Sequence, residues 1–105
     1  MSGGAGPDEA AQRLRLVSLG RRLADRGLIT AAEGNLSVRL GGRRFLVTPA
    51  GRAKGELEPS DLLVVDEAGV CAQGQPTSEW PLHRAVYALR SDVSAICHAH
   101  PPYAT

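Results

Sequence analysis

Two histidines separated by one residue, His98 and His100, are the strongest candidates for metal chemistry in this sequence. In an extended segment, residues i and i+2 project from the same face, so the two imidazoles would point together. Zinc is the metal that imidazole ligands most often take in a site that also contains a carboxylate. A His-x-His spacing is a weak signal by itself, and the alternative is a pair of half-buried polar side chains at the end of a strand.

Glu79 is the second candidate for a chemical role. It follows Thr77 and Ser78 and lies directly before Trp80 and Pro81, a pattern typical of a helix N-terminus. Several backbone N–H groups are unpaired at such a helix start. The simpler interpretation is that an acidic residue in the first helical turn only stabilises the helix dipole.

Three pairs of residues are candidates for holding an anion. They are Gly34-Asn35, Ala50-Gly51 and Thr77-Ser78. Glycine lets the backbone approach a ligand closely, an asparagine amide donates hydrogen bonds, and the unpaired N–H groups of a helix start favour phosphate. Turn formation for the first two pairs and helix capping for the third are the alternatives.

The first half of the chain must position two of these pairs. Residues 7–27 open with proline and acidic residues, close on glycine and carry leucines at helical spacing, which predicts a helix. Apolar and polar residues then alternate over 36–40, which predicts a half-buried strand. Residues 45–47 are expected to form the return strand of a hairpin that turns at 41–42.

The second half of the chain must position Glu79 and the histidine pair. An aliphatic run predicts a strand over 62–66, with 70–71 able to pair back against it. Residues 78–89 carry the cleanest helical stripe of apolar residues, and 93–100 alternates as a strand.

Three further residues have structural interpretations. His83 and Tyr87 lie four residues apart on one side of the second predicted helix, and we expect both to pack or form hydrogen bonds rather than bind a ligand. Cys97 alternates with His98 and is expected to face the core.

The composition excludes several classes of protein. The 105 residues are 43% apolar, and 12 basic residues stand against 11 acidic ones for a net charge of +1. This fits one globular domain and gives no basic surplus for nucleic acid or a membrane surface. The longest aliphatic run has four residues, and no signal peptide or Cys-x-x-Cys spacing is present. We therefore expect a cytoplasmic protein with reduced thiols.

Four motifs in a fixed order resemble a known family. They are Gly34-Asn35-Leu36-Ser37, Thr48-Pro49-Ala50-Gly51, Pro76-Thr77-Ser78-Glu79-Trp80 and His98-Ala99-His100-Pro101-Pro102-Tyr103-Ala104-Thr105. Together they resemble the class II aldolase/adducin family, nearest to its L-fuculose-1-phosphate aldolase branch. The resemblance implies an α/β fold, with three layers (α/β/α) around a central, largely antiparallel sheet. Residues 1–6 would be a flexible tail and 7–105 the N-terminal part of the domain.

The resemblance also implies a chemistry. It is that of a zinc-dependent aldolase, a lyase that cleaves a ketose 1-phosphate into dihydroxyacetone phosphate and an aldehyde. Zn²⁺ bound by His98, His100 and Glu79 would polarise the substrate carbonyl and stabilise the enediolate, and Glu79 would be the catalytic acid and base. The residues that would hold the substrate phosphate are Gly34, Asn35, Ala50, Gly51, Thr77 and Ser78.

The sequence departs from the family pattern in two respects. Ala50 stands where a hydroxyl residue is common, so the backbone N–H groups of Ala50 and Gly51 are expected to compensate. The third zinc histidine and a C-terminal proton donor have no counterpart in these 105 residues, so we expect the N-terminal part of a longer protein that forms a homotetramer when whole.

Other functions on the same scaffold stay open. Epimerases, dehydratases and decarboxylases share the family fold and differ in the reaction. A non-enzymatic interpretation, as an adducin-like binding module or an inactive, truncated chain, is the remaining alternative.

Overall fold

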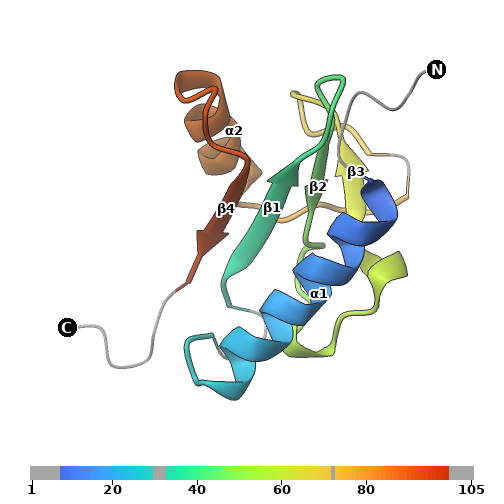
Figure 1. Ribbon diagram of the computed structural model, residues 1–105, viewed down its shortest axis with the longest axis vertical. Coiled ribbons are helices and arrows are strands. Elements are labelled where there is room, and N and C mark those ends of the chain that lie inside the picture. The colour runs from blue at the N-terminus through green and yellow to red at the C-terminus, as the bar shows by residue number, and fades with distance from the viewer. Residues whose placement is uncertain (1–7, 30–32, 72, 100–105) are drawn as a thin grey trace.

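The computed structural model describes residues 8–29, 33–71 and 73–99. Helices and strands follow one another in the order α1 (Glu9–Asp25), β1 (Asn35–Arg39), β2 (Phe45–Val47), η2 (Lys54–Glu56), η3 (Pro59–Asp61), β3 (Leu63–Val65), α2 (Trp80–Leu89) and β4 (Ala95–His98). Figure 1 shows the four strands side by side, with α1 in front of them and α2 behind β4 and β1. Both predicted helices are confirmed.

The four strands form one antiparallel sheet in the order β3-β2-β1-β4. The β1–β2 pair is the predicted hairpin, with Ser37 opposite Val47. On its other side β1 pairs with β4, although more than 50 residues separate the two strands in the sequence. In that pair Asn35 lies opposite His98. This register brings two candidate site residues together on one face of the sheet.

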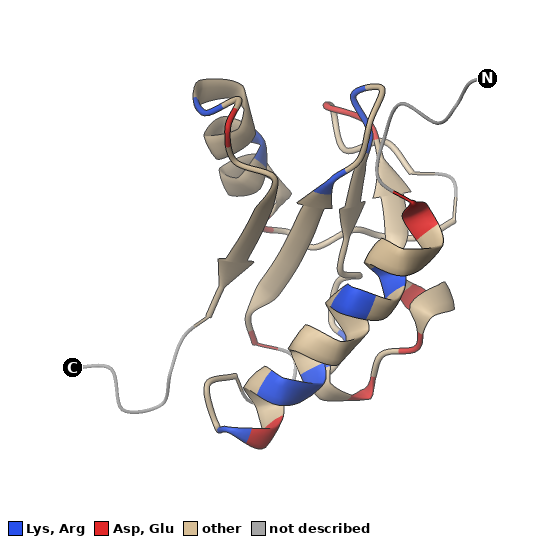
Figure 2. Cartoon of the chain, viewed as in Figure 1, with Lys and Arg blue, Asp and Glu red and all other residues tan. Residues whose placement is uncertain are grey.

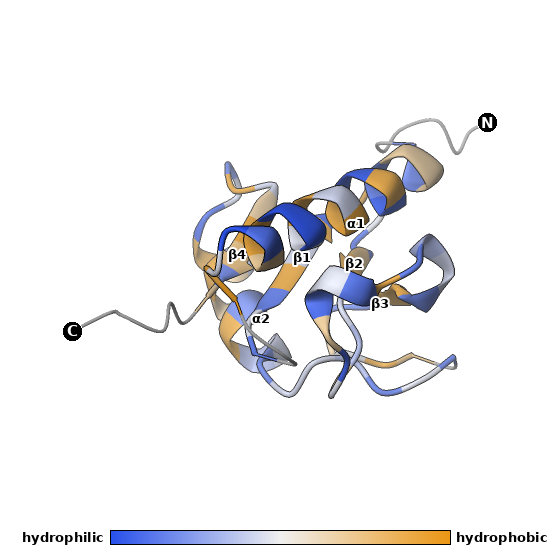
Figure 3. Ribbon diagram, turned by 90° about the horizontal axis from the view of Figure 1, so that it is seen from below, coloured by the Kyte–Doolittle hydropathy of each residue, from blue (hydrophilic) through white to orange (hydrophobic). Residues whose placement is uncertain are grey.

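Each face of the sheet is covered by one helix. Alternate residues of β1 point to α1, where Leu36 and Val38 join Leu16 and Val17 in an apolar cluster. The other face carries an aromatic cluster in which Phe45 packs on the α2 residues Trp80 and Tyr87. Figure 3 looks along the sheet and shows the two helices on its opposite sides. The predicted three-layer α/β/α arrangement with an antiparallel sheet is confirmed.

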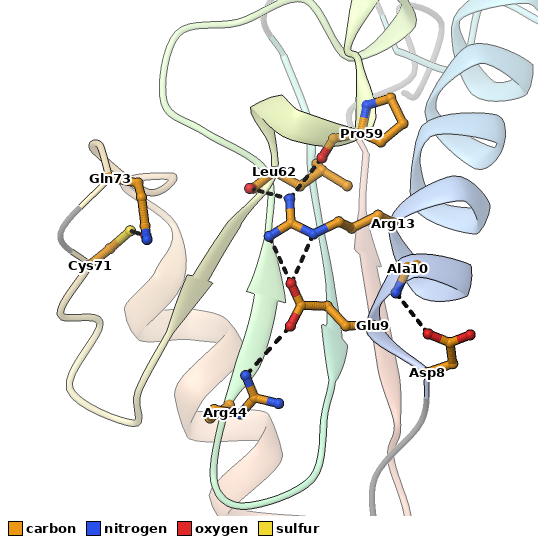
Figure 4. A network of polar contacts seen from close by, with 9 residues as sticks. All are labelled: Asp8, Glu9, Ala10, Arg13, Arg44, Pro59, Leu62, Cys71 and Gln73. Atoms are coloured by element: carbon orange, nitrogen blue, oxygen red, sulfur yellow. Dashed lines mark hydrogen bonds and ion pairs between the residues drawn. The ribbon is translucent and has the colours of Figure 1, made fainter. Parts of the chain in front are cut away.

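Polar contacts tie α1 to the loop before β3. Arg13 of α1 donates to the carbonyl oxygens of Pro59 and Leu62, at 2.8 and 2.9 Å, and its guanidinium pairs with Glu9. Figure 4 shows this network, in which Glu9 also reaches Arg44 of the hairpin. The contacts therefore hold α1 against both the hairpin and η3.

Charged positions of both signs are interspersed over the described residues. Figure 2 shows basic positions along α1 and acidic positions at both of its ends. No helix within the described ranges is long and apolar enough to cross a membrane.

Two expectations about local structure are wrong. The chain at Val70 and Cys71 does not pair back on β3, because Asp66 accepts hydrogen bonds from the N–H groups of Ala68 and Val70 and bends the chain into a turn. Cys97 is exposed rather than buried in the core. It lies on β4, an edge strand, and the core cluster under α1 centres on β1 and β2 instead.

Candidate active site

One pocket brings together the residues that the sequence had placed in separate motifs. Its lining includes all six candidate anion-binding residues, the candidate acid–base residue, and two others; the lining residues are Glu33, Gly34, Asn35, Ala50, Gly51, Lys54, Thr77, Ser78 and Glu79. They come from the start of β1, the loop after β2 and the segment before α2. Three regions distant in the sequence therefore share one concave surface.

Gly34 allows the start of β1 to approach β4. Its φ of +80° lies in the left-handed region, and a Cβ there would stand 2.8 Å from Ile29 Cγ2 and 3.1 Å from the carbonyl oxygen of His98. A larger residue would meet both a strained backbone and a steric clash. Glycine thus sets the position of Asn35 in the pocket wall.

The loop after β2 and the segment before α2 are joined by backbone hydrogen bonds. Pro49 and Pro76 form an isolated bridge, Ala50 N donates to Gln75 O at 2.9 Å, and Thr77 N donates to Thr48 O at 3.0 Å. One expectation needs correction here, since the Ala50 N–H is already used within the protein. The Ala50 N–H group therefore does not replace the missing hydroxyl. The neighbouring Gly51 forms a turn with φ +71° and lines the pocket.

Thr77 combines a turn contact just before α2 with a place in the pocket wall. Its Oγ1 accepts a hydrogen bond from Glu79 N at 3.2 Å, and helix α2 begins one residue later at Trp80. Helix capping by this pair is wrong as an alternative, because Glu79 is the N-cap residue of α2 and no side chain makes a capping bond there. Thr77 is buried, while Ser78 is exposed. The Thr77 hydroxyl hydrogen and the Ser78 hydroxyl are both able to donate to an anion.

The Glu79 carboxylate lies next to the His98 imidazole. Their Oε1 and Nδ1 atoms are 3.9 Å apart, and the side chains are 47% and 28% exposed. A nitrogen and a carboxylate donor at one pocket edge fit the ligand preference of zinc. His100 lies outside the described residues. Within those residues, no group of three His, Cys, Asp or Glu side chains is arranged to hold a metal ion, so the predicted ligand set stays a prediction.

Lys54 is a pocket residue that sequence reasoning missed. Its side chain is 2% exposed, Nζ donates to Arg52 O at 2.9 Å, and burial lowers the pKa of its ammonium group. The sequence offered one indication of its importance: Lys54 is the single lysine, and all the other basic residues of the chain are arginines. Lys54 brings a cation to a pocket that otherwise carries two carboxylates among its described lining residues.

His83 contacts the pocket residue Asn35 from behind, a connection that the sequence did not indicate. The side chain is fully buried, with Nδ1 2.6 Å from Ser37 Oγ and Nε2 bonded to Asn35 Oδ1. Burial lowers its pKa to about 4, and the nearby His98 acts in the same direction. The predicted packing and hydrogen-bonding role of His83 and Tyr87 is confirmed, since Tyr87 bonds the same serine hydroxyl.

A comparison with known protein families shows to which family this chain belongs. Residues 14–105 match the model of the class II aldolase and adducin N-terminal domain. The chain belongs to this family. The three segments that surround the pocket all fall inside the matched region.

Individual class II aldolase relatives carry different reaction names. The chain is 40% identical over 91 residues to a methylthioribulose-1-phosphate dehydratase of Methylococcus capsulatus, covering 86% of this chain and 45% of that protein. It is 37% identical over 86 residues to an L-fuculose phosphate aldolase of Methanocaldococcus jannaschii, covering 82% and 47%. The crystal structure of YgbL from Klebsiella pneumoniae superposes with a TM-score of 0.86 at 38% identity, covering 93% and 48%. The chain therefore spans about half the length of the relatives it matches.

Proposed function

We propose that the protein is a metal-dependent lyase acting on a ketose 1-phosphate, and that the pocket holds the substrate phosphate. One observation carries the proposal: a single pocket is lined by three glycine- or hydroxyl-bearing segments and by Glu79, with His98 beside it. Remote phosphate binding would supply the energy that orients the reacting carbons.

The pocket offers several groups of the kind that bind phosphate. Asn35 contributes an amide, Thr77 and Ser78 contribute hydroxyls, and Gly51 contributes backbone at a turn. Phosphate carries up to two negative charges, and Lys54 is the basic side chain among the described lining residues. Together these groups would bind the phosphate, and the sugar carbons would then lie near Glu79.

Glu79 is proposed to move the proton. In retro-aldol cleavage a hydroxyl proton is lost as the aldehyde forms, and a carbon of dihydroxyacetone phosphate gains a proton. A half-exposed carboxylate at the pocket edge can exchange a proton with the substrate and with solvent. The Glu79 Oε1 atom is thus the proposed proton carrier.

The proposed metal ligands are His98, His100 and Glu79. Zn²⁺ would supply a Lewis acid for the substrate carbonyl. The adjacency of His98 and Glu79 supports this assignment, and native mass spectrometry tests it. We expect one zinc per chain, lost on treatment with a chelator and in His98→Ala. A folded protein that carries no metal, or a metal other than zinc, would contradict the assignment.

A dehydratase reaction is the second candidate, favoured by the dehydratase relative described above. The names of the two relatives both contain a sugar phosphate, methylthioribulose 1-phosphate in one and fuculose phosphate in the other. The two reactions differ in whether an aldehyde or a water molecule leaves. The same phosphate groups and the same Glu79 carboxylate would serve either one.

A substrate panel separates the two candidates. The protein is incubated with fuculose 1-phosphate and with methylthioribulose 1-phosphate, and products are followed by mass spectrometry. Aldolase activity releases dihydroxyacetone phosphate, whereas dehydration gives a product lighter by one water. Glu79→Gln is expected to lower turnover about 100-fold or more while inorganic phosphate still binds. Equal turnover by Glu79→Gln would remove Glu79 from the mechanism, and no turnover with either substrate would favour the binding-module alternative.

The homotetramer and the cytoplasmic location stay predictions. Both derive from the sequence and the family resemblance. Native mass spectrometry of the same samples gives the subunit number.

A further inference from the structure

Four buried side chains form a continuous hydrogen-bonded chain from α2 to the pocket wall. Tyr87 Oη lies 2.8 Å from Ser37 Oγ, Ser37 Oγ lies 2.6 Å from His83 Nδ1, and His83 Nε2 bonds Asn35 Oδ1. Ser37 and His83 are fully buried, and Asn35 and Tyr87 are each 4% exposed. Only the last member, Asn35, lines the pocket.

The chemistry of the end group fixes the direction of every hydrogen bond. A carboxamide oxygen only accepts, so His83 Nε2 must donate to Asn35. A neutral imidazole carries one N–H, which leaves Nδ1 as an acceptor for the Ser37 hydroxyl. Ser37 Oγ then accepts from the Tyr87 hydroxyl. Each donor in the chain has one acceptor.

This direction determines which atom Asn35 offers to the pocket. Its carbonyl oxygen is engaged by His83, so the NH₂ group is the part that can donate to an anion. An amide rotated by half a turn would have nearly the same shape but would present an oxygen to the phosphate. The orientation of the amide therefore matters for anion binding and hardly affects packing.

We propose that His83, held in its Nε2–H tautomer by Ser37 and Tyr87, is a positioning residue that orients the Asn35 amide so that its NH₂ group donates to the phosphate. The inference rests on the proposed phosphate role of the pocket. His83 itself touches no substrate, because Asn35 separates it from the pocket.

Substitutions at His83 test the inference through phosphate affinity. Binding of inorganic phosphate is measured by calorimetry with a chelator present, so that no metal-bound phosphate contributes. His83→Leu removes the donor and is expected to weaken binding about tenfold or more, whereas His83→Gln keeps an N–H near the Nε2 position and is expected to stay within about threefold of wild type. This rescue by the conservative variant is not expected if His83 only fills space.

A control variant separates positioning from general loss of stability. Val65 belongs to the aromatic cluster that contains Tyr87 and does not line the pocket. Val65→Ala truncates this buried side chain. It is expected to lower the melting temperature and leave phosphate affinity unchanged. Tyr87→Phe, which keeps the ring and its packing, is expected to weaken phosphate binding by a smaller factor than His83→Leu.

The wild-type protein gives a readout that needs no variant. Long-range ¹H–¹⁵N spectra should show His83 as the Nε2–H tautomer, and the Asn35 NH₂ resonances should shift when phosphate is added. An Nδ1–H tautomer, or equal phosphate affinity in wild type and His83→Leu, would overturn the inference alone. A wild-type protein that binds no phosphate would overturn the pocket's proposed role as well.

Discussion

At the scale of single residues, the groups that line the pocket are held in place by hydrogen bonds to neighbouring residues. Asn35 is held by His83, Thr77 is engaged by the N–H of Glu79, and the Ala50 N–H is consumed by Gln75. Lys54 is nearly fully buried beside them. Small changes at these positions should therefore alter ligand binding more than they alter the fold.

Gly34→Ala is expected to destabilise the protein and weaken phosphate binding together. The new Cβ would meet Ile29 and the His98 carbonyl at a positive φ. Gly42→Ala is the matched control, because Gly42 has φ +69° and open space around it. We expect about 1 kcal/mol of lost stability for the control and roughly 1–3 kcal/mol more for Gly34→Ala in urea melts. Equal losses would mean that close approach to β4 is unimportant.

Lys54→Met is expected to weaken binding of inorganic phosphate about tenfold or more, because the cation is removed and the aliphatic stem is kept. Arg52→Met is the control, since the Arg52 guanidinium is directed to Asp61 at 3.2 Å and is absent from the pocket lining. Calorimetry measures both affinities. If both variants bind phosphate like wild type, Lys54 has no part in the anion site.

At the scale of elements, the pocket is assembled by contacts between segments that have little structure of their own. The strands that form it have three to five residues, too few for independent stability. The Pro49–Pro76 bridge and the backbone bonds around it join the loop after β2 to the start of α2. The helix α1 supports the other face of the same strands.

Arg13→Met is expected to loosen α1 from the loop before β3. The substitution leaves the carbonyl oxygens of Pro59 and Leu62 without the guanidinium donors that they have now. A loss of about 1–3 kcal/mol in unfolding free energy is expected. Arg15→Met on the same helix, at an exposed position, should change stability by less than about 0.5 kcal/mol. Similar effects of the two variants would contradict a specific role for Arg13.

At the scale of the whole molecule, the buried His83 makes stability depend on pH. Its folded pKa is about 4, below the ordinary value of 6.5, mainly because burial disfavours the charged ring. The unfolded chain therefore binds a proton first, so this contribution is fully present above about pH 6.5 and is lost as the pH falls toward 4. The shift corresponds to roughly 3 kcal/mol. Urea melts with a chelator present should show this acid limb, and His83→Gln should flatten it. An unchanged limb in that variant would assign the effect to other groups.

Sequence patterns were informative where the information is local. Helical and period-two spacing predicted α1, the β1–β2 hairpin, α2 and β4, and an aliphatic run predicted β3. These patterns are local, because the face that an element buries shows in the spacing of its own residues. The failure at Val70 arose from a side chain–backbone turn around Asp66 that the apolar pattern did not reveal. Among the site residues, the glycine and hydroxyl motifs were visible in the sequence, whereas the pocket position of Lys54 and the contact of His83 with Asn35 were not.

The sequence by itself determined which residue types are available for the site. It also determined where the two helices and the strands lie along the chain. Only the tertiary structure decided that Asn35 stands opposite His98, that three loops share one pocket, and that His83 reaches Asn35. These contacts join residues up to 63 positions apart along the chain, Asn35 and His98 being the extreme pair. Such contacts depend on how the sheet and α2 pack as a whole, because no short segment of this sequence can bury its apolar face alone.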